Sequence, residues 1–306
     1  GHLRRGGHPG MSTVTATMQR PHEDQNRATP REIVGRILLW AAIIVILIWT
    51  LFPLYWALAS SIRTNPDSYA IKFLPWLNFD PTLSGWRQMW SLPEIKTALK
   101  NSVIIGIGAA TFATILGALA GYGIARFYFD RPSNGSLTTW FLSQRIIPPV
   151  VFVTPFVLFM FQVGLYDKVW GLVLLNATFN LPFPIIILTQ MFREVPIELE
   201  EAAQVDGASR LEIFLKIAVP LVAPGIVVSW ILCMAFSWNE FLFAFSTTQD
   251  KARPMSVMLV GAEQTRGVDY LFVGTRMVTM MSVPIVAALL VQRYIVRGLS
   301  LGAVKG

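Results

Sequence analysis

The sequence predicts an all-α protein that crosses a membrane six times, and its composition and block pattern support this fold class. Hydrophobic residues make up 54% of the chain and charged residues only 14%, whereas soluble proteins carry about 25% charged residues. The uncharged residues form long blocks, and each exceeds the ~20 residues that a helix needs to cross ~30 Å of hydrocarbon. Five blocks contain no charged side chain: 37–62, 101–125, 146–166, 169–192 and 217–239. A sixth block, 271–292, is interrupted only by Arg276.

The basic character of the chain does not indicate a nucleic-acid partner. The formal net charge is +7, but Lys and Arg are scattered over the loops, as is ordinary in membrane proteins. The single cysteine, Cys233, lies inside an apolar block, where we expect it to contribute to packing. The three histidines, His2, His8 and His22, all precede the first block, so no histidine-based metal or catalytic site is expected within the membrane.

The block positions divide the chain into three regions. We expect an N-terminal tail over residues 1–35, a transmembrane domain over 36–300 and a C-terminal tail over 301–306. Residues 1–10 precede Met11 and are interpreted as a tag remnant or an extended start, so no inference rests on them. The distribution of Lys and Arg between the two sides does not decide the orientation.

Glycine and proline indicate how the first spans pack and bend. Pro53 is expected to kink span one. Gly117, Gly121 and Ala125 recur every fourth residue on one face of span two, where small residues permit close helix contact. Span three is expected to begin near Arg145, which we interpret as an anchor at the cytoplasmic start of that span.

Prolines interrupt both of the next two spans. Span three contains Pro148, Pro149 and Pro155, and span four contains Pro182 and Pro184. Each proline removes a backbone hydrogen bond, so neighbouring helices or a water-filled cavity must supply partners for the freed carbonyls. These spans are therefore expected to line a cavity rather than act as inert anchors.

The polar segment between spans four and five, residues 193–219, predicts two short helices that meet at Gly207. Glu198, Glu200 and Glu201 lie in the first turns of the first helix, where the helix dipole favours negative charge.

A turn and a helix start follow within that segment. Asp206 and Gly207 form a turn signal, and Ser209 with Glu212 has the spacing of a capping box that starts the second helix.

The spacing in this segment resembles the EAA signature of the inner-membrane subunits of binding-protein-dependent ABC importers. That signature runs Glu-Ala-Ala, three residues, Gly, nine residues and Ile-x-Leu-Pro. In this chain the matching residues are Glu201-Ala202-Ala203, Gly207 and Ile217-Ala218-Val219-Pro220, with Val219 in place of leucine as the one departure.

The likeness extends over roughly residues 35–306. Four further motifs look like the carbohydrate branch of these permeases, and most like the second permease subunit of maltose-type importers. They are Gly164-Leu165-Tyr166-Asp167, Leu181-Pro182-Phe183, Trp238-Asn239-Glu240-Phe241 and the closing Gly302-Ala303-Val304-Lys305-Gly306.

The resemblance implies a permease subunit that carries a sugar or sugar derivative across the bacterial inner membrane. It also implies a cytoplasmic N-terminus and C-terminus, and a cytoplasmic coupling helix that docks on an ATPase subunit. The residues carried over to that contact are Glu200, Glu201, Ala202, Ala203, Asp206, Gly207 and Pro220.

The energy source and partners follow from what the chain lacks and from the resemblance. No Gly-x-x-x-x-Gly-Lys-Ser/Thr phosphate loop occurs in the sequence, so the chain is expected to be neither an enzyme nor a cofactor-binding protein. The resemblance implies two ATPase subunits that bind ATP and Mg, a homologous second permease subunit and an extracytoplasmic sugar-binding protein, all with membrane lipid around the permease pair.

Candidate substrate contacts are few. Asn180, Asn239 and Glu240 are polar residues beside or within spans and are candidates for the translocation path, although Glu240 equally fits the outer membrane interface. The resemblance implies that the partner permease supplies most sugar contacts. It also places an external loop, 247–270, against the binding protein, with Lys251, Arg253, Glu263 and Gln264 as candidate contacts.

Other functions fit the sequence less well. A stand-alone secondary sugar transporter or channel would leave the EAA spacing unexplained, and no internal repeat of the kind found in many carriers is visible. A membrane enzyme would need a cluster of reactive side chains at membrane depth. Within the importer interpretation the substrate stays open: an oligosaccharide or glycoside is expected first, and a monosaccharide or polyol second.

Overall fold

The computed structural model describes residues 30–68, 72–260, 263–264, 267–268 and 270–302. The chain divides into two compact units, Gly1–Phe52 and Pro53–Gly306. The regular structure of the described residues is helical apart from one antiparallel ladder, in which Glu263–Gln264 (β1) pairs with Gly267–Val268 (β2). The all-α polytopic fold predicted from the sequence is confirmed.

The described part of the first unit belongs to helix α1 (Pro30–Ser61). Its most hydrophobic stretch buries no residue within the structure, and Trp49 is 83% exposed. A long helix that is apolar on every side suits a bilayer rather than water. Residues 30–35, assigned to the tail from the sequence, already belong to this helix, while the rest of that tail lies outside the described residues.

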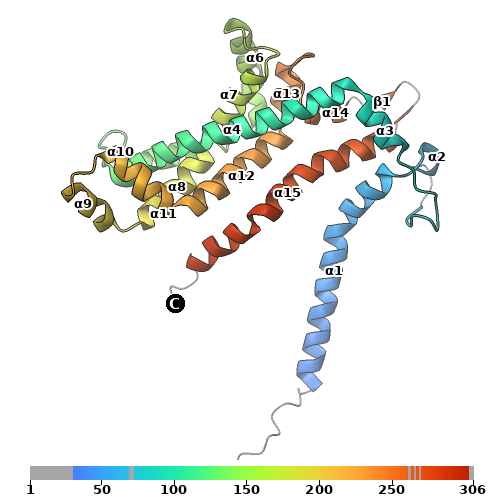
Figure 1. Cartoon of the computed structure of the whole chain (residues 1–306), viewed down its shortest axis with the longest axis horizontal. Coiled ribbons are helices and arrows are strands. Elements are labelled where there is room, and N and C mark those ends of the chain that lie inside the picture. Colours follow the sequence, from blue (N-terminus) through green and yellow to red (C-terminus); the bar gives the residue numbers. More distant parts are fainter. Residues whose placement is uncertain (1–29, 69–71, 261–262, 265–266, 269, 303–306) are drawn as a thin grey trace, which may run out of the picture. The chain divides into compact units, whose positions relative to one another are not determined.

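The second unit is built around α4 (Pro93–Arg126), which lies along three other helices in Figure 1: α7 (Val169–Asn180), α8 (Pro182–Glu194) and α12 (Ala223–Asn239). The other described helices are α2 (Asn65–Ser68), α3 (Ser84–Ser91), α5 (Asn134–Ser143), η1 (Pro149–Phe152), α6 (Val153–Gln162), α9 (Ile197–Val205), α10 (Arg210–Ile213), η2 (Phe214–Ala218), α11 (Val219–Leu221), α13 (Leu242–Thr247), α14 (Met255–Val260) and α15 (Tyr270–Gly302). Here η1 is a 3-10 turn and η2 a π-helical turn.

The close approach of α4 to α8 depends on two glycines. A Cβ atom on Gly117 would lie 2.6 Å from Cβ of Pro184, and one on Gly121 would lie 3.0 Å from the backbone nitrogen of Thr189. Both distances are too short for an unstrained contact, so the two backbones meet only because these side chains are absent. The small-residue face predicted on span two therefore does pack against a neighbouring helix.

The described helices account for up to five of the six predicted membrane crossings. Three described helical stretches are long and apolar enough to span a membrane alone: Ile33–Ser61, Pro93–Arg126 and Tyr270–Leu289. Two bent pairs meet the same test when each is counted as one span, α7 with α8 and Arg210–Leu221 with α12, which makes five. The remaining predicted span contains only a shorter apolar helical stretch, Pro149–Gln162.

The bend in span four coincides with its prolines. α7 and α8 meet at Leu181 with an angle of 47°. Pro182 and Pro184 have no N–H to donate to the carbonyls four residues earlier, those of Thr178 and Asn180, so the regular ladder is interrupted there. The break leaves polar backbone groups in the middle of a membrane span.

One predicted boundary is wrong. Helix α4 begins at Pro93, eight residues before the charge-free block at 101–125, because its first turns bury Ile95 and Ala98 between charged positions. Between α4 and the apolar stretch Pro149–Gln162 lies α5, a helix that the sequence did not predict and that packs against α8. The α5 sequence mixes small polar residues with apolar ones, so its composition does not distinguish a helix from a loop.

Arg145, interpreted from the sequence as a cytoplasmic anchor, contacts a residue of span four. It follows α5, immediately before the break at Pro148 and Pro149, and its guanidinium carbon lies 4.1 Å from the centre of the Phe183 ring. Phe183 stands beside the bend of span four. Arg145 therefore lies beside the bend of span four, and its role as a cytoplasmic anchor stays a prediction.

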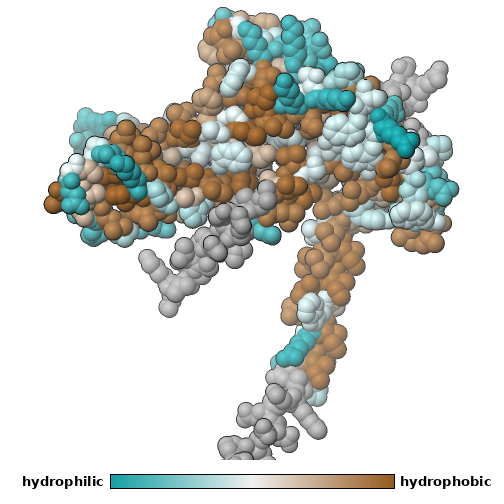
Figure 2. Space-filling model, in the orientation of Figure 1, coloured by the Kyte–Doolittle hydropathy of each residue, from teal (hydrophilic) through white to brown (hydrophobic). Residues whose placement is uncertain are grey.

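The surface of the second unit separates apolar from polar regions. In Figure 2 the surface over α8 and α12 is mainly hydrophobic, whereas hydrophilic residues gather at the end that carries α9 and on the upper projection that carries α6. A broad apolar flank is what a membrane-embedded helical bundle requires.

The α4–α8 contact predicts opposite effects at two glycines of one helix. Gly117→Ala should destabilise the chain by about 1–3 kcal/mol, since the new methyl group would overlap the rigid Pro184 ring. Gly123→Ala is the matched control, because its Cβ would meet nothing within 4 Å, and it should leave stability unchanged or raise it by up to ~1 kcal/mol. Thermal unfolding of the purified proteins in mild detergent measures both. Equal melting temperatures for the two variants would contradict this account of the interface.

Candidate functional site

The coupling segment, residues 195–221, forms two short helices as the sequence predicts. Helix α9 (Ile197–Val205) follows Pro196, and its first turn contains Glu198 and Glu200. It ends at a turn in which Gly207 has a φ of +85°, a left-handed conformation that costs other residues about 1–2 kcal/mol. The Gly207 N–H donates to the carbonyl of Gln204 at 3.0 Å and closes that turn.

The second helix of the coupling segment starts at the predicted capping box. The Glu212 N–H donates to Ser209 Oγ at 3.3 Å, and the Ser209 N–H donates to Glu212 Oε2 at 3.0 Å. Lys216 Nζ donates to the other carboxylate oxygen, also at 3.0 Å.

Glu200 faces the interior of the second unit rather than its surface. Its side chain is 1% exposed, and one carboxylate oxygen accepts a 2.7 Å hydrogen bond from Arg126 Nε at the end of α4. The other oxygen accepts from Tyr122 Oη, also at 2.7 Å. Arg126 Nη2 donates to the carbonyl of Val195, at 2.9 Å. Both charges are thus paired and further hydrogen-bonded, the condition under which a buried ion pair is tolerated.

Aromatic packing surrounds this ion pair. The Tyr122 ring lies 5.3 Å from the Phe192 ring of α8 and 5.0 Å from the Phe214 ring of the π-helical turn. These rings belong to a buried cluster that also contains Leu188 and Ala218. The ion pair therefore joins α9 to the end of α4, and the ring cluster joins that end of α4 to α8 and to the π-helical turn.

The opposite side of the coupling segment is open. Val205 and Leu211 expose 88% and 62% of their surface, an apolar pair that water would not favour unless another protein covers it. Most of the predicted contact residues share this exposure: Glu201, Ala202, Asp206, Gly207 and Pro220 are exposed, and Ala203 is half-buried.

Glu200 is the exception among the predicted contact residues, because its carboxylate is used inside the chain. Sequence reasoning did not identify Tyr122 and Arg126 as its partners. They lie 78 and 74 residues away along the chain, and no local spacing rule connects them.

The three predicted path residues have partners within the chain. Asn180 is buried and donates to Ser237 Oγ at 2.9 Å, which joins α7 to α12. Asn239 is exposed and donates to the carbonyl of Ala235 in its own helix. The Glu240 carboxylate accepts from the N–H groups of Phe243 at 2.7 Å and Ala244 at 3.0 Å, so it caps the start of α13.

The loop that is predicted to be external is held by Asp167, a residue of the Gly164-Leu165-Tyr166-Asp167 motif. Its carboxylate accepts four backbone N–H groups, those of residues 249–252, at 3.1–3.2 Å. Burial alone would raise the pKa of Asp167, but these four donors outweigh it and the net pKa is lowered.

The candidate binding-protein residues lie on or near this loop. Asn101 Nδ2 donates to the carbonyls of Lys251 and Arg253, whose side chains are exposed. Glu263 and Gln264 form β1, and only their backbone is described.

Comparison with known proteins supports the family that the spacing in the coupling segment resembles. Residues 113–301 match the family described as binding-protein-dependent transport system inner membrane component. The chain belongs to this family. It is 34% identical over 278 residues to the trehalose transport system permease protein SugB of Mycobacterium tuberculosis, an alignment covering 89% of this chain and 98% of that protein.

Two further comparisons extend the likeness over nearly the whole permease. The trehalose/maltose transport system permease protein MalG of Thermococcus litoralis is 29% identical, with 90% of this chain and 99% of that protein covered. A chain of the crystal structure of a bacterial ABC transporter involved in the import of the acidic polysaccharide alginate has the same fold. The TM-score is 0.74 at 20% identity, and the match covers 88% of this chain and 99% of that one.

Neighbouring glutamates of the permease should differ in their effect on stability. Glu200→Ala should destabilise it by about 3–5 kcal/mol, because Arg126 would remain buried without its partner. Glu201→Ala should change stability by no more than ~0.5 kcal/mol, since that side chain is exposed. Thermal unfolding in detergent gives the comparison. If Glu200→Ala has the same melting temperature as Glu201→Ala and the unmodified chain, the buried ion pair does not hold α9 in place.

The Asp167 contacts predict a local and pH-dependent effect. Asp167→Ala should expose the N–H groups of residues 249–252 and destabilise the loop by about 1–3 kcal/mol, seen as faster amide hydrogen exchange there. Because the folded-state pKa is lowered, the contribution is complete above the ordinary Asp pKa of about 3.9 and is lost as pH falls through the folded value. Exchange as slow in the variant as in the unmodified protein would rule out this role for Asp167.

Proposed function

We propose that this permease is one of two membrane subunits of an ATP-driven importer, and that it carries a small sugar of the trehalose or maltose type. The named relatives transport trehalose or trehalose and maltose, and each is aligned over about nine-tenths of this chain. A homologous second permease, two ATPase subunits that bind ATP and Mg, and an extracytoplasmic sugar-binding protein complete the proposed assembly.

The observation that carries the proposal is the two-sided coupling segment. One side of α9 is fixed to α4 through Glu200 and Arg126, while the other exposes Val205 beside Glu201 and Asp206. An ATPase subunit that binds the exposed side of α9 would be connected through α9 to α4, and through α4 to α8. Closure of the ATPase pair around ATP would then displace α9, and the ends of α4 and α8 would move with it.

The proposed orientation follows from the same segment. An ATPase works where ATP is present, so the coupling segment and the N-terminus lie on the cytoplasmic side. The loop held by Asp167 then faces outward, where Lys251 and Arg253 are available to a sugar-binding protein. Glu263 and Gln264 extend this proposed contact.

Co-purification tests the proposed assembly. The tagged chain, solubilised from its native membrane in mild detergent, should bring down an ATPase subunit and a second permease in stoichiometric amounts, identified by mass spectrometry. Gly207→Pro should lose the ATPase and keep the second permease, because proline cannot adopt the +85° φ and lacks the N–H that closes the turn.

Gly164→Pro is the matched control for this experiment. Gly164 also has a positive φ, of +66°, and its N–H closes a turn at 3.2 Å, but it lies between α6 and α7, away from the coupling segment. We expect this variant to retain the ATPase. A chain that purifies alone and transports sugar after reconstitution without ATP would overturn the proposal and favour a secondary carrier. Equal loss of the ATPase from both variants would show that Gly207 has no special place in the contact.

A further inference from the structure

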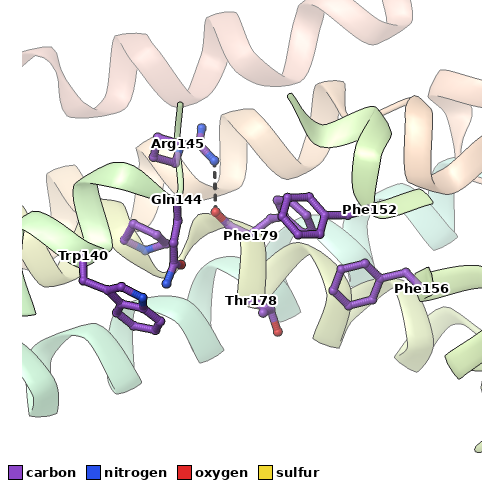
Figure 3. A pocket seen from close by; sticks show the side chains of 8 residues that line it. Trp140, Gln144, Arg145, Phe152, Phe156, Thr178 and Phe179 are labelled. Atoms are coloured by element: carbon purple, nitrogen blue, oxygen red, sulfur yellow. Dashed lines mark hydrogen bonds between the residues drawn. The ribbon is translucent and has the colours of Figure 1, made fainter. Parts of the chain in front are cut away.

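The broken spans three and four line a cavity of about 260 Å³ that is open on one side, so that Trp140, Arg145 and Thr178 remain exposed. Four aromatic side chains form much of its wall: Trp140 from α5, Phe152 and Phe156 from span three, and Phe179 from the end of α7. In Figure 3 Trp140 stands at one end of the cavity, and Phe152 and Phe156 stand at the other. A cavity just below the ~300–1,000 Å³ of typical small-molecule pockets suits one ring rather than a chain of rings.

Polar groups lie between these aromatic ends. Arg145 Nη1 donates to the carbonyl of Phe179 at 3.0 Å, and the rest of the guanidinium covers the Phe183 ring at 4.1 Å. Thr178 Oγ1 donates to the carbonyl of Leu174, so its lone pairs stay available as acceptors. Within the described part of the chain, the side-chain amide of Gln144 has no hydrogen-bond partner.

These polar groups adjoin the break in span four. Span four runs over residues 169–194 with its break at Leu181, and the cavity adjoins that break. A helix rises about 1.5 Å per residue, so this level is close to the middle of a ~30 Å hydrocarbon layer. An Arg at such a depth costs about 2.5–3.5 kcal/mol unless it faces a partner or a wet cavity. Among the described residues no acidic side chain pairs with Arg145.

We propose that this cavity binds one neutral sugar ring during passage, with the C–H face of the ring on Trp140 and its hydroxyls on Gln144, Arg145 and Thr178. This inference rests on the proposed function and adds a substrate contact within this chain. Aromatic rings offer apolar faces to the C–H groups of a sugar, and a few convergent polar groups fix its orientation. Lipid is a poorer occupant, because an acyl chain would leave the Gln144 amide and the remaining Arg145 donors unsatisfied.

ATP-driven uptake by the reconstituted assembly tests the subsite. The complex, with its binding protein, is placed in proteoliposomes, and uptake of radiolabelled trehalose, maltose and glucose is measured. With the sugar that the unmodified assembly transports, Trp140→Ala should reduce uptake at subsaturating sugar about tenfold. Sugar-free ATPase activity and subunit composition should be unchanged. Trp170→Ala is the matched control: Trp170 is 58% exposed against 57% for Trp140 but does not line the cavity, so uptake should match the unmodified assembly.

Two more variants separate sugar contact from a packing role. Gln144→Leu removes the free amide at similar size and should also lower uptake at unchanged ATPase activity. A Thr178→Cys thiol should be alkylated by a small maleimide and protected by the transported sugar, whereas Phe159→Cys, exposed on α6 outside the cavity, should not be protected.

The outcomes distinguish the inference from the proposed function. If the assembled, ATP-hydrolysing complex takes up none of the three sugars, the proposed substrate class fails. If it takes up sugar, but Gln144→Leu behaves like the unmodified assembly and sugar gives no protection at Thr178→Cys, the subsite is refuted while the importer function stands. Protection at that position supports the subsite even if Trp140→Ala fails to assemble.

Discussion

The buried contact between Glu200 and Arg126 is the constraint on which the arrangement of the coupling segment depends. Helix α9 is only nine residues long, and isolated helices shorter than about 12–15 residues are marginal in water. Its position must therefore come from tertiary contacts. The ion pair provides a tertiary contact of fixed geometry, because both carboxylate oxygens of Glu200 and two guanidinium nitrogens of Arg126 form hydrogen bonds of 2.7–2.9 Å. Without this contact α9 would be a loosely attached amphipathic segment, and a force applied to its exposed side would not reach the membrane helices.

That force would reach α4 and α8 together, because the two helices are in close contact along their length. Near the coupling segment, Tyr122 packs on Phe192, and further along, Gly121 and Gly117 bring the two backbones together. The contact with α8 stops where α8 begins, at Pro182, and beyond that point α4 packs against α7. The aromatic and polar cavity adjoins the break between α7 and α8. The same helix α8 thus forms part of the rigid attachment at one end and part of the cavity wall at the other.

Local features of this structure were predictable from the sequence, and features that join distant segments were not. The capping box at Ser209, the turn at Gly207 and the glycine face of α4 depend on residues within about one or two helical turns, so their spacing is enough. The partners of Glu200 lie more than seventy residues away, and a buried glutamate has the same sequence pattern as the exposed Glu201 beside it. Asp167 is a similar case. The sequence shows it as part of a motif, but its hydrogen bonds to the backbone of residues 249–252 are seen only in the folded structure.

Arg145 shows most clearly why this second class of feature escapes sequence reasoning. A lone Arg beside a hydrophobic block is usually a surface anchor, and nothing next to it in the chain argues otherwise. Its position becomes intelligible only through the prolines of another span, which remove N–H donors and interrupt the ladder beside the Phe179 carbonyl. Arg145 donates a hydrogen bond to that carbonyl and its guanidinium lies over the Phe183 ring. The charge thereby gains a hydrogen-bond acceptor, and a carbonyl at the helix break gains a donor. The other donors of Arg145 and the side-chain amide of Gln144 face the open cavity, which is why we propose a polar ligand for it.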